Sequence, residues 1–201
     1  KDINDIFIAK LSTDGSLIWQ EEFPNLTVNQ IKVSTDGYIY TGGHGFLKKL
    51  KSNGKEEWIK SFGTSRVDSI NISEDGDIYL TGDTYSDFQG KNPSKEGAGY
   101  IIRFNDKGDI LWSDIIANQA RNTAFSEDYQ TLFVLGKYKN ENWDNIDFSI
   151  NTYNIDGTLI SSRKLSEYPD HIEKLMASYN SDEPKFDKEG NLYLSGSKEN
   201  K

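Results

Sequence analysis

Short apolar segments separated by turn residues recur along the whole chain. Segments such as SINI, DIYLTG, GYIIRF and DILWSDII are rich in β-branched and aromatic residues, and most alternate apolar with polar positions. Many are followed by Asp-Gly, Asn-Gly or Glu-Gly, which supply the positive φ that tight hairpin turns need. The pattern therefore predicts an all-β protein of antiparallel strands.

The turns recur at constant spacings, which identifies an internal repeat. A second turn follows 22 residues after the first in three copies and 33 residues after it in the last copy. A tryptophan stands four residues after the first turn glycine in three of the four copies. The first turns lie at Gly15, Gly54, Gly108 and Gly157, the second at Gly37, Gly76, Gln130 and Gly190, and the position four after the first holds Trp19, Trp58, Trp112 and Ser161.

Four-stranded units of roughly 40 to 50 residues repeating in line are typical of the blades of a β-propeller. With strands named A to D from the axis outward, complete blades are predicted at about 28–61, 67–116 and 120–164. A C-D pair at about 1–23 precedes them and an A-B pair at about 182–197 follows. Residues 1–201 thus form one propeller domain, either a closed four-blade ring or an arc of a larger propeller, and we favour the arc. The repeated tryptophans are expected between blades.

The repeat resembles the bacterial SBBP-type β-propeller repeats. The resemblance rests on DIFIAKLSTDGSLIW and SFGTSRVDSINISEDGDIYLTGDTYSDFQG, and it weakens in the fourth copy, where Ser161 replaces Trp and Thr152 replaces a basic residue. That basic residue is Lys10, Lys49 or Arg103 in the other copies. The resemblance implies a secreted or cell-surface bacterial protein without a fixed enzymatic activity. The Gly-x-x-x-Trp spacing is also similar to the quinoprotein-like repeats of outer-membrane assembly lipoproteins.

Charge and composition narrow the partners. The net charge is -9 with only four Arg, which argues against nucleic acid. No Cys is available for disulfides, and no apolar run reaches the roughly 18 residues of a membrane span. The chain starts KDIND, without Met or a signal peptide, so we expect a segment of a longer or processed protein whose flanking propeller repeats are natural partners.

Loops of unequal length are predicted on one face only. A-B and C-D turns are uniform, whereas B-C and D-A connections vary, and variation of this kind favours that face as the functional one. Its long loops, DTYSDFQGKNPSKEGA and KYKNENWDNID, mix aromatic and polar residues suited to a sugar or a peptide. The alternative is that the aromatics hold the loops to the blades. The candidate ligand-binding residues are Tyr85, Asp87, Phe88, Asn142, Trp143 and Asp144.

Two further features bear on this face. Residues 169–180 place apolar side chains at helical spacing behind Pro169 and Asp170, which predicts a short helix for packing or for a partner. Eight residues before each second turn stands an Asx residue, and Asp68 and Asp182 are candidate calcium ligands. The alternative is local capping of backbone N–H groups. The four Asx residues are Asn29, Asp68, Asn122 and Asp182, and no other cofactor is predicted.

Catalytic motifs are absent from the sequence. His44 and His171 are the only histidines, no phosphate-binding glycine motif occurs, and STDGSLIW misses the sialidase Asp-box by one residue. Paired carboxylates for glycoside hydrolysis stay open, because 32 acidic residues are available. The sequence predicts a noncatalytic scaffold or adhesive module that binds protein or glycan through its long-loop face. The alternatives are a docking propeller of an envelope assembly, or a fragment of a carbohydrate-active or quinoprotein-like enzyme.

Overall fold

The computed structural model describes residues 6–24, 26–87, 90–92, 96–116, 119–139, 146–164, 185–187, 189 and 191–193. Every secondary-structure element among them is a β-strand, and all pairings are antiparallel, which confirms the all-β prediction. Within this part of the chain no helix is long and apolar enough to cross a bilayer. The helix predicted at 169–180 lies outside the described residues.

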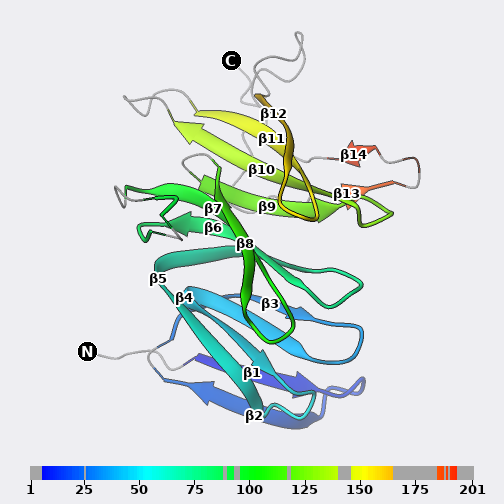
Figure 1. Ribbon diagram of the computed structural model, residues 1–201. Helices are drawn as coiled ribbons and strands as arrows, with labels where there is room; N and C mark the ends of the chain where they lie inside the picture. Colours follow the sequence, from blue (N-terminus) through cyan, green and yellow to red (C-terminus); the bar gives the residue numbers. More distant parts are fainter. Residues whose placement is uncertain are drawn as a thin grey trace, which may run out of the picture.

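The strands form four sheets that succeed one another along the molecule (Figure 1). In chain order a two-stranded sheet comes first, a six-stranded and a four-stranded sheet follow, and a second two-stranded sheet, which lies beside β9, is last. The first is β1 (Ile6–Leu11) with β2 (Leu17–Phe23), and the last is β13 (Lys185–Phe186) with β14 (Leu192–Tyr193). The six-stranded sheet contains β3 (Val28–Val33), β4 (Ile39–Leu50), β5 (Glu56–Ile72), β6 (Ile78–Thr84), β7 (Ala98–Phe104) and β8 (Ile110–Ile115). The four-stranded sheet contains β9 (Gln119–Phe125), β10 (Thr131–Lys139), β11 (Ile146–Asn154) and β12 (Leu159–Lys164).

Strands β4 and β5 are long because each joins two strands of the repeat. Residues 39–43 of β4 pair with β3, whereas residues 46–50 pair with the first part of β5. The second part of β5, from Ser65, pairs with β6. Gly45 and Gly63, both with φ of 74°, lie at the two junctions. The six-stranded sheet therefore contains two successive copies of the four-stranded unit.

Each tryptophan of the repeat reaches into the next copy. The indole Nε1 of Trp19 donates a hydrogen bond to the carbonyl of Ser52 at 3.1 Å, and Lys10 Nζ donates to the same oxygen at 3.3 Å. Trp58 and Lys49 share the carbonyl of Asp106 in the same way, each at 3.1 Å. In the next copy, Trp112 Nε1 (3.0 Å) and Arg103 Nη1 (2.5 Å) share the carbonyl of Ile155. We call this arrangement the seam: an indole and a basic side chain on one carbonyl, two residues before the next turn glycine.

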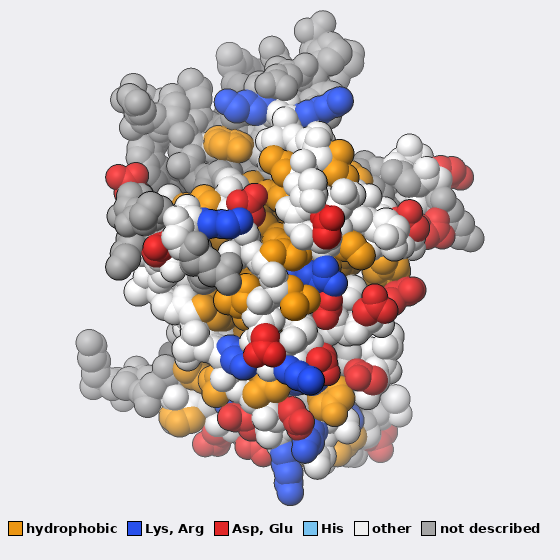
Figure 2. All heavy atoms as spheres, in the orientation of Figure 1, with side chains coloured by type: hydrophobic (Ala, Val, Ile, Leu, Met, Phe, Trp, Pro, Cys, Tyr) orange, Lys and Arg blue, Asp and Glu red, His pale blue; other side chains and the backbone are white. Residues whose placement is uncertain are grey.

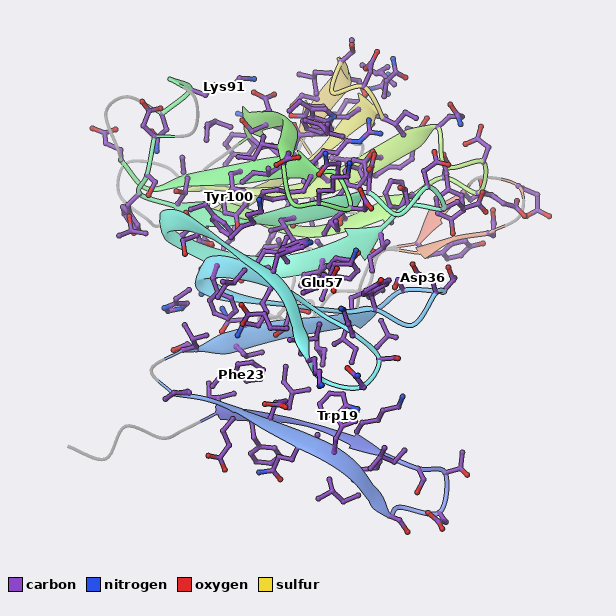
Figure 3. The ribbon with its side chains drawn as sticks, turned by 60° about the horizontal axis from the view of Figure 1, so that its bottom comes forward. Trp19, Phe23, Asp36, Glu57, Lys91 and Tyr100 are labelled. Atoms are coloured by element: carbon purple, nitrogen blue, oxygen red, sulfur yellow. The ribbon has the colours of Figure 1, made fainter. Side chains whose placement is uncertain are left out.

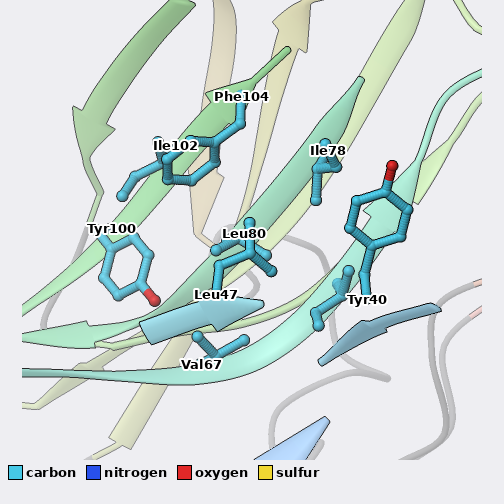
Figure 4. Close-up of a cluster of buried hydrophobic side chains, with 9 residues drawn as sticks. Tyr40, Leu47, Val67, Ile78, Leu80, Tyr100, Ile102 and Phe104 are labelled. Atoms are coloured by element: carbon cyan, nitrogen blue, oxygen red, sulfur yellow. The ribbon is translucent and has the colours of Figure 1, made fainter. Parts of the chain in front are cut away.

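The core lies between successive copies of the four-stranded unit. The largest cluster combines side chains of β4, β5, β6 and β7, and Figure 4 shows them interdigitated. A second cluster joins Tyr79 and Ile101 to Leu132 and Tyr153 of the following sheet. The indole of Trp112 stacks on the ring of Tyr153 at 5.9 Å between centroids. The first cluster consists of Tyr40, Leu47, Val67, Ile70, Ile78, Leu80, Tyr100, Ile102 and Phe104.

The hairpin turns are closed by the same local hydrogen bonds in each copy. At the first turn, the amide of Gly15 donates to the carbonyl of Ser12 at 3.0 Å, and Ser12 Oγ and the amide of Ser16 donate to the Asp14 carboxylate. These bonds lower the pKa of Asp14 to about 2. Positive φ at the turn glycines, 85° at Gly15 and 92° at Gly157, explains their recurrence. Gly37 and Gly76 share this conformation, and Gly190 lies outside the described residues.

The seam predicts that a glycine-to-alanine substitution lowers the free energy of unfolding by different amounts at two turns. A Cβ at Gly157 would lie 2.7 Å from Trp112 Cδ2, whereas a Cβ at Gly15 would have no atom within 4 Å. Both positions have positive φ, so alanine costs about 1 kcal/mol at each from the backbone. Gly157→Ala should lose a further 1 to 3 kcal/mol, roughly, through overpacking. Denaturant unfolding of the two variants measures the difference, and equal losses would show that the indole does not rest on this turn.

Candidate functional site

A pocket of about 550 Å³ opens where β4, β5 and β6 meet. It lies at the end of the sheets where B-C and D-A connections were predicted, so it is on the long-loop face. Arg66 and Asp83 supply charged groups, and His44 and Tyr85 are exposed at its rim. The full lining is His44, Gly45, Gly63, Thr64, Ser65, Arg66, Asp83 and Tyr85.

Close backbone packing forms the floor of this pocket. A Cβ at Gly45 would lie 2.4 Å from the carbonyl oxygen of Gly63, and a Cβ at Gly63 would lie 2.1 Å from Ser86 Oγ. Ser86 Oγ accepts a hydrogen bond from the amide of Thr64 at 2.8 Å. The buried hydroxyl of Ser65 donates to the carbonyl of Phe62 at 3.0 Å. The pocket is therefore held in shape by its own backbone contacts.

Tyr85 forms one wall. Its amide donates a hydrogen bond to the carbonyl of Thr64 at 2.9 Å, and its ring rests against Gly97, where a Cβ would lie 3.0 Å from Tyr85 Cε1. The residue is nevertheless 61% exposed. Most of the ring is consequently available to a ligand, because only one edge is used to hold the loop.

A charged cluster links the pocket to the neighbouring sheet. Arg66 Nε lies 2.9 Å from Asp68 Oδ1, and Arg66 Nη2 lies 3.2 Å from Asp83 Oδ1. Arg121 Nη1, from β9, lies 3.3 Å from Asp68 Oδ2, and Arg121 Nη2 donates to Gln119 Oε1 at 2.8 Å. Two guanidinium groups, one from each of two neighbouring sheets, therefore flank one carboxylate, and Arg66 also lines the pocket.

Arg121 takes the repeat position at which the sequence predicted Asn122. The strand register skips Asn29 in β3, Asp68 in β5 and Arg121 in β9, so these three are the equivalent bulge residues. The third copy differs because its second turn has one additional residue. Tyr129, not Gln130, has the positive φ (55°), and its amide donates to the carbonyl of Ser126 as Gly76 does to Ser73. Counting back from Tyr129 would have found Arg121.

Burial controls the ionisation of the central carboxylate. Only 13% of the Asp68 side chain is exposed, and this burial raises its pKa to about 6, against the opposing effect of Arg66 and Arg121. Its charged form is thus retained at neutral pH with the help of both guanidinium groups. Asp68 is better placed to orient Arg66 and Arg121 than to contact a ligand itself.

The candidate ligand-binding residues of the two long loops are only partly described. Tyr85 lines the pocket, and Asp87 accepts a hydrogen bond from the amide of Asn92 at 3.0 Å inside its own loop. Phe88, Asn142, Trp143 and Asp144 lie outside the described residues. His44, Arg66 and Arg121 were not predicted as ligand-binding residues, whereas Asp83 belongs to the long loop that was predicted to bind a ligand. Only the sequence position of His44, at the end of a B strand, could have indicated it.

Calcium binding at Asp68 and Asp182 stays a prediction, because Asp182 lies outside the described residues. At Asp68 the two ion pairs occupy both carboxylate oxygens, which does not favour a cation there. Among the residues that the structure describes, no group of three or more His, Cys, Asp or Glu side chains could hold a metal ion.

No family model and no curated protein sequence matches this chain, whereas solved structures do. Luciferin-regenerating enzyme is 13% identical with a TM-score of 0.60, over 98% of this chain and 64% of that one. BamB from Moraxella catarrhalis is 13% identical with a TM-score of 0.59, over 94% and 53%. The C-terminal WD40 domain of Sif2 is 14% identical with a TM-score of 0.58, over 95% and 52%.

These structures are β-propellers, so the predicted fold class is confirmed. The described sheets are not closed into a ring, and the chain spans 52% to 64% of the three structures, as an arc of a larger propeller would. The finer assignment to the SBBP type stays a prediction, because no family model matches. At these identities the likeness shows the fold and not the activity.

The prediction that the chain is not an enzyme was wrong as an exclusion, because an enzyme is among the matched structures. A luciferin-regenerating enzyme shares this architecture at a TM-score of 0.60. The sequence argument relied on missing motifs, but a fold does not determine the activity of the site that it carries. The fold is therefore open to catalysis as well as to binding.

The raised pKa of Asp68 predicts a pH-dependent difference between wild type and Asp68→Asn. The folded pKa of about 6 lies above the value of about 3.9 in unfolded chains, so the folded state binds more protons between pH 4 and 6. Stability from the protonated carboxyl is present below pH 4 and lost as pH rises through 6. The free energy of unfolding of wild type minus that of Asp68→Asn should fall by roughly 2 kcal/mol over this window and then level off. Denaturant unfolding from pH 4 to 8 measures it, and a rise instead would mean that the ion pairs outweigh burial.

Proposed function

We propose that this chain is a propeller binding module that recognises a saccharide unit at the pocket between β4, β5 and β6. The observation that carries the proposal is the exposed ring of Tyr85 beside Arg66 and Asp83 in a pocket of about 550 Å³. This volume is in the range of small-ligand sites. The proposal keeps the long-loop face as the binding face.

The chemistry of the pocket suits a sugar. A pyranose presents an apolar C–H face that packs on an aromatic ring, and its hydroxyls need both donors and acceptors at the edge. Tyr85 supplies the ring, Arg66 supplies donors, and Asp83 supplies an acceptor. Arg66 is held by Asp68 and Asp83, so little of its conformational freedom remains to be lost on binding.

Overall charge favours a neutral glycan. The net charge is -9, and Figure 2 shows Lys and Arg interspersed with Asp and Glu on the face in view. No broad basic surface is seen on that face to attract a polyanion. The proposal includes secretion or display at the cell surface, because either location would expose the pocket to such glycans.

A protein partner is the second candidate, as a scaffold or as a docking propeller of an envelope assembly. It is favoured by the fold, since the neighbours include BamB and a WD40 domain. The two candidates differ in the ligand that occupies the pocket, so peptides that compete with the glycan in the binding assay would favour the protein partner. Hydrolysis of the bound oligosaccharides, measured as new reducing ends, would reveal enzymatic turnover.

Substitution of Tyr85 tests the proposal. Residues 1–201 should bind neutral oligosaccharides on a glycan array. In titration calorimetry with such an oligosaccharide, Tyr85→Ala should bind at least about tenfold more weakly, a loss of about 1.4 kcal/mol of binding free energy. Tyr193→Ala is the matched control, because Tyr193 is 60% exposed and lies on β14, outside the pocket lining.

Two results would contradict the proposal. One is the absence of glycan binding at millimolar concentrations by a folded chain. The other is equal weakening by Tyr85→Ala and Tyr193→Ala, which would place binding elsewhere. Circular dichroism and unfolding midpoints of both variants distinguish these results from misfolding.

A further inference from the structure

The β1–β2 hairpin exposes side chains whose repeat equivalents are buried in every other copy. Leu11, four residues before its turn glycine, is 58% exposed, and Phe7, eight residues before, is 59% exposed. Trp19 and Phe23 occupy the opposite face, between the hairpin and the next sheet (Figure 3). The equivalents of Leu11 are Leu50 (1%), Phe104 (2%) and Tyr153 (1%), and those of Phe7 are Phe46 (2%), Tyr100 (0%) and Ser149 (0%).

The turn at Gly15 also lacks, among the described residues, the contacts that the later turns make. At the three later turns, the carbonyl two residues before the glycine accepts an indole and a basic side chain from the preceding copy. The glycines of those turns contact these side chains, and a Cβ at Gly54 would lie 3.0 Å from the Trp19 ring. At the first turn, no described residue donates a hydrogen bond to the Thr13 carbonyl, and nothing lies within 4 Å of a Cβ at Gly15.

We propose that the outer face of β1–β2 and the turn at Gly15 form a docking seam for one further blade of the same repeat type. That blade carries a tryptophan four residues after its turn glycine. It also carries Lys or Arg five residues before the same glycine. Its indole and its cation bind the Thr13 carbonyl, and its aliphatic side chains cover Phe7 and Leu11. The proposal continues an interface that the molecule already makes three times, and it is independent of the saccharide proposal.

The described copies of the repeat do not offer such a blade. Trp19, Trp58 and Trp112 are each engaged with the copy that follows them, so none of these three indoles is available in a second molecule. The last complete sheet carries Ser161 and Thr152 at the two positions. The β13–β14 pair lies beside β9, away from β1–β2 (Figure 1). The matched propellers are longer than this chain, so the fold accommodates additional blades.

An extended chain tests this proposal. Residues 67–145 are fused before residues 4–201, so that an added copy of Arg103 and Trp112 precedes the turn at Gly15 and β1–β2 becomes the outer half of a full blade. Hydrogen exchange of the β1–β2 amides should slow at least about tenfold relative to residues 1–201. The matched control carries Trp112→Ala and Arg103→Thr in the added copy alone, and it should lose most of this protection.

Unchanged exchange, or equal protection by the control, would overturn the proposal. So would protection of the β1–β2 amides in residues 1–201 that appears together with a dimer in light scattering, since a second copy would then be the occupant. A second pair of variants works without the extension. Leu11→Ser should leave the melting temperature of residues 1–201 unchanged, whereas Leu50→Ser should lower it by at least about 5 °C. Equal losses would show that Leu11 is already covered, and the proposal would fail.

Discussion

The structure depends on one repeated interaction, in which an indole and a basic side chain of one copy share a single carbonyl of the next turn. This contact covers part of a large, half-buried ring and gives one turn carbonyl two hydrogen-bond donors. It also fixes the distance between successive sheets, because the turn glycine lies directly against the ring. Tyr153 and Trp112, stacked at 5.9 Å, show how the core continues from it.

The binding face follows from the same constraint. Once the seams set the spacing of the sheets, the short junctions at Gly45 and Gly63 must lie against each other, and a Cβ at Gly45 would be 2.4 Å from the Gly63 carbonyl. The pocket between them is therefore a product of sheet spacing and backbone packing. Arg66 reaches it because Asp68, at a bulge, turns toward the neighbouring sheet and meets Arg121.

Much of the fold could be predicted from local patterns. Alternating strands and glycine turns predicted antiparallel β-structure, and the constant spacing of glycine and tryptophan predicted the propeller. The prediction of the candidate site was weaker. Tyr85 was named, but Arg66 and Arg121 were not. Their roles depend on Asp68, which lies at a strand bulge, and on Asp83, which lies on the neighbouring strand β6. Alignment on Gln130 was one residue out because a single added residue in that turn moved the positive φ to Tyr129.

The sequence by itself determined the repeat, the strand class and the position of each turn, because these depend on period-two patterning and on the backbone conformation of individual residues. Only the tertiary structure decided which carbonyl each tryptophan meets, which charges pair across the sheets and which repeat positions remain exposed. Those properties depend on distances between segments from different copies, to which local patterning is insensitive. Leu11 and Leu50 occupy the same position in the repeat, yet one is 58% exposed and the other 1%, because only one of them has a neighbouring sheet.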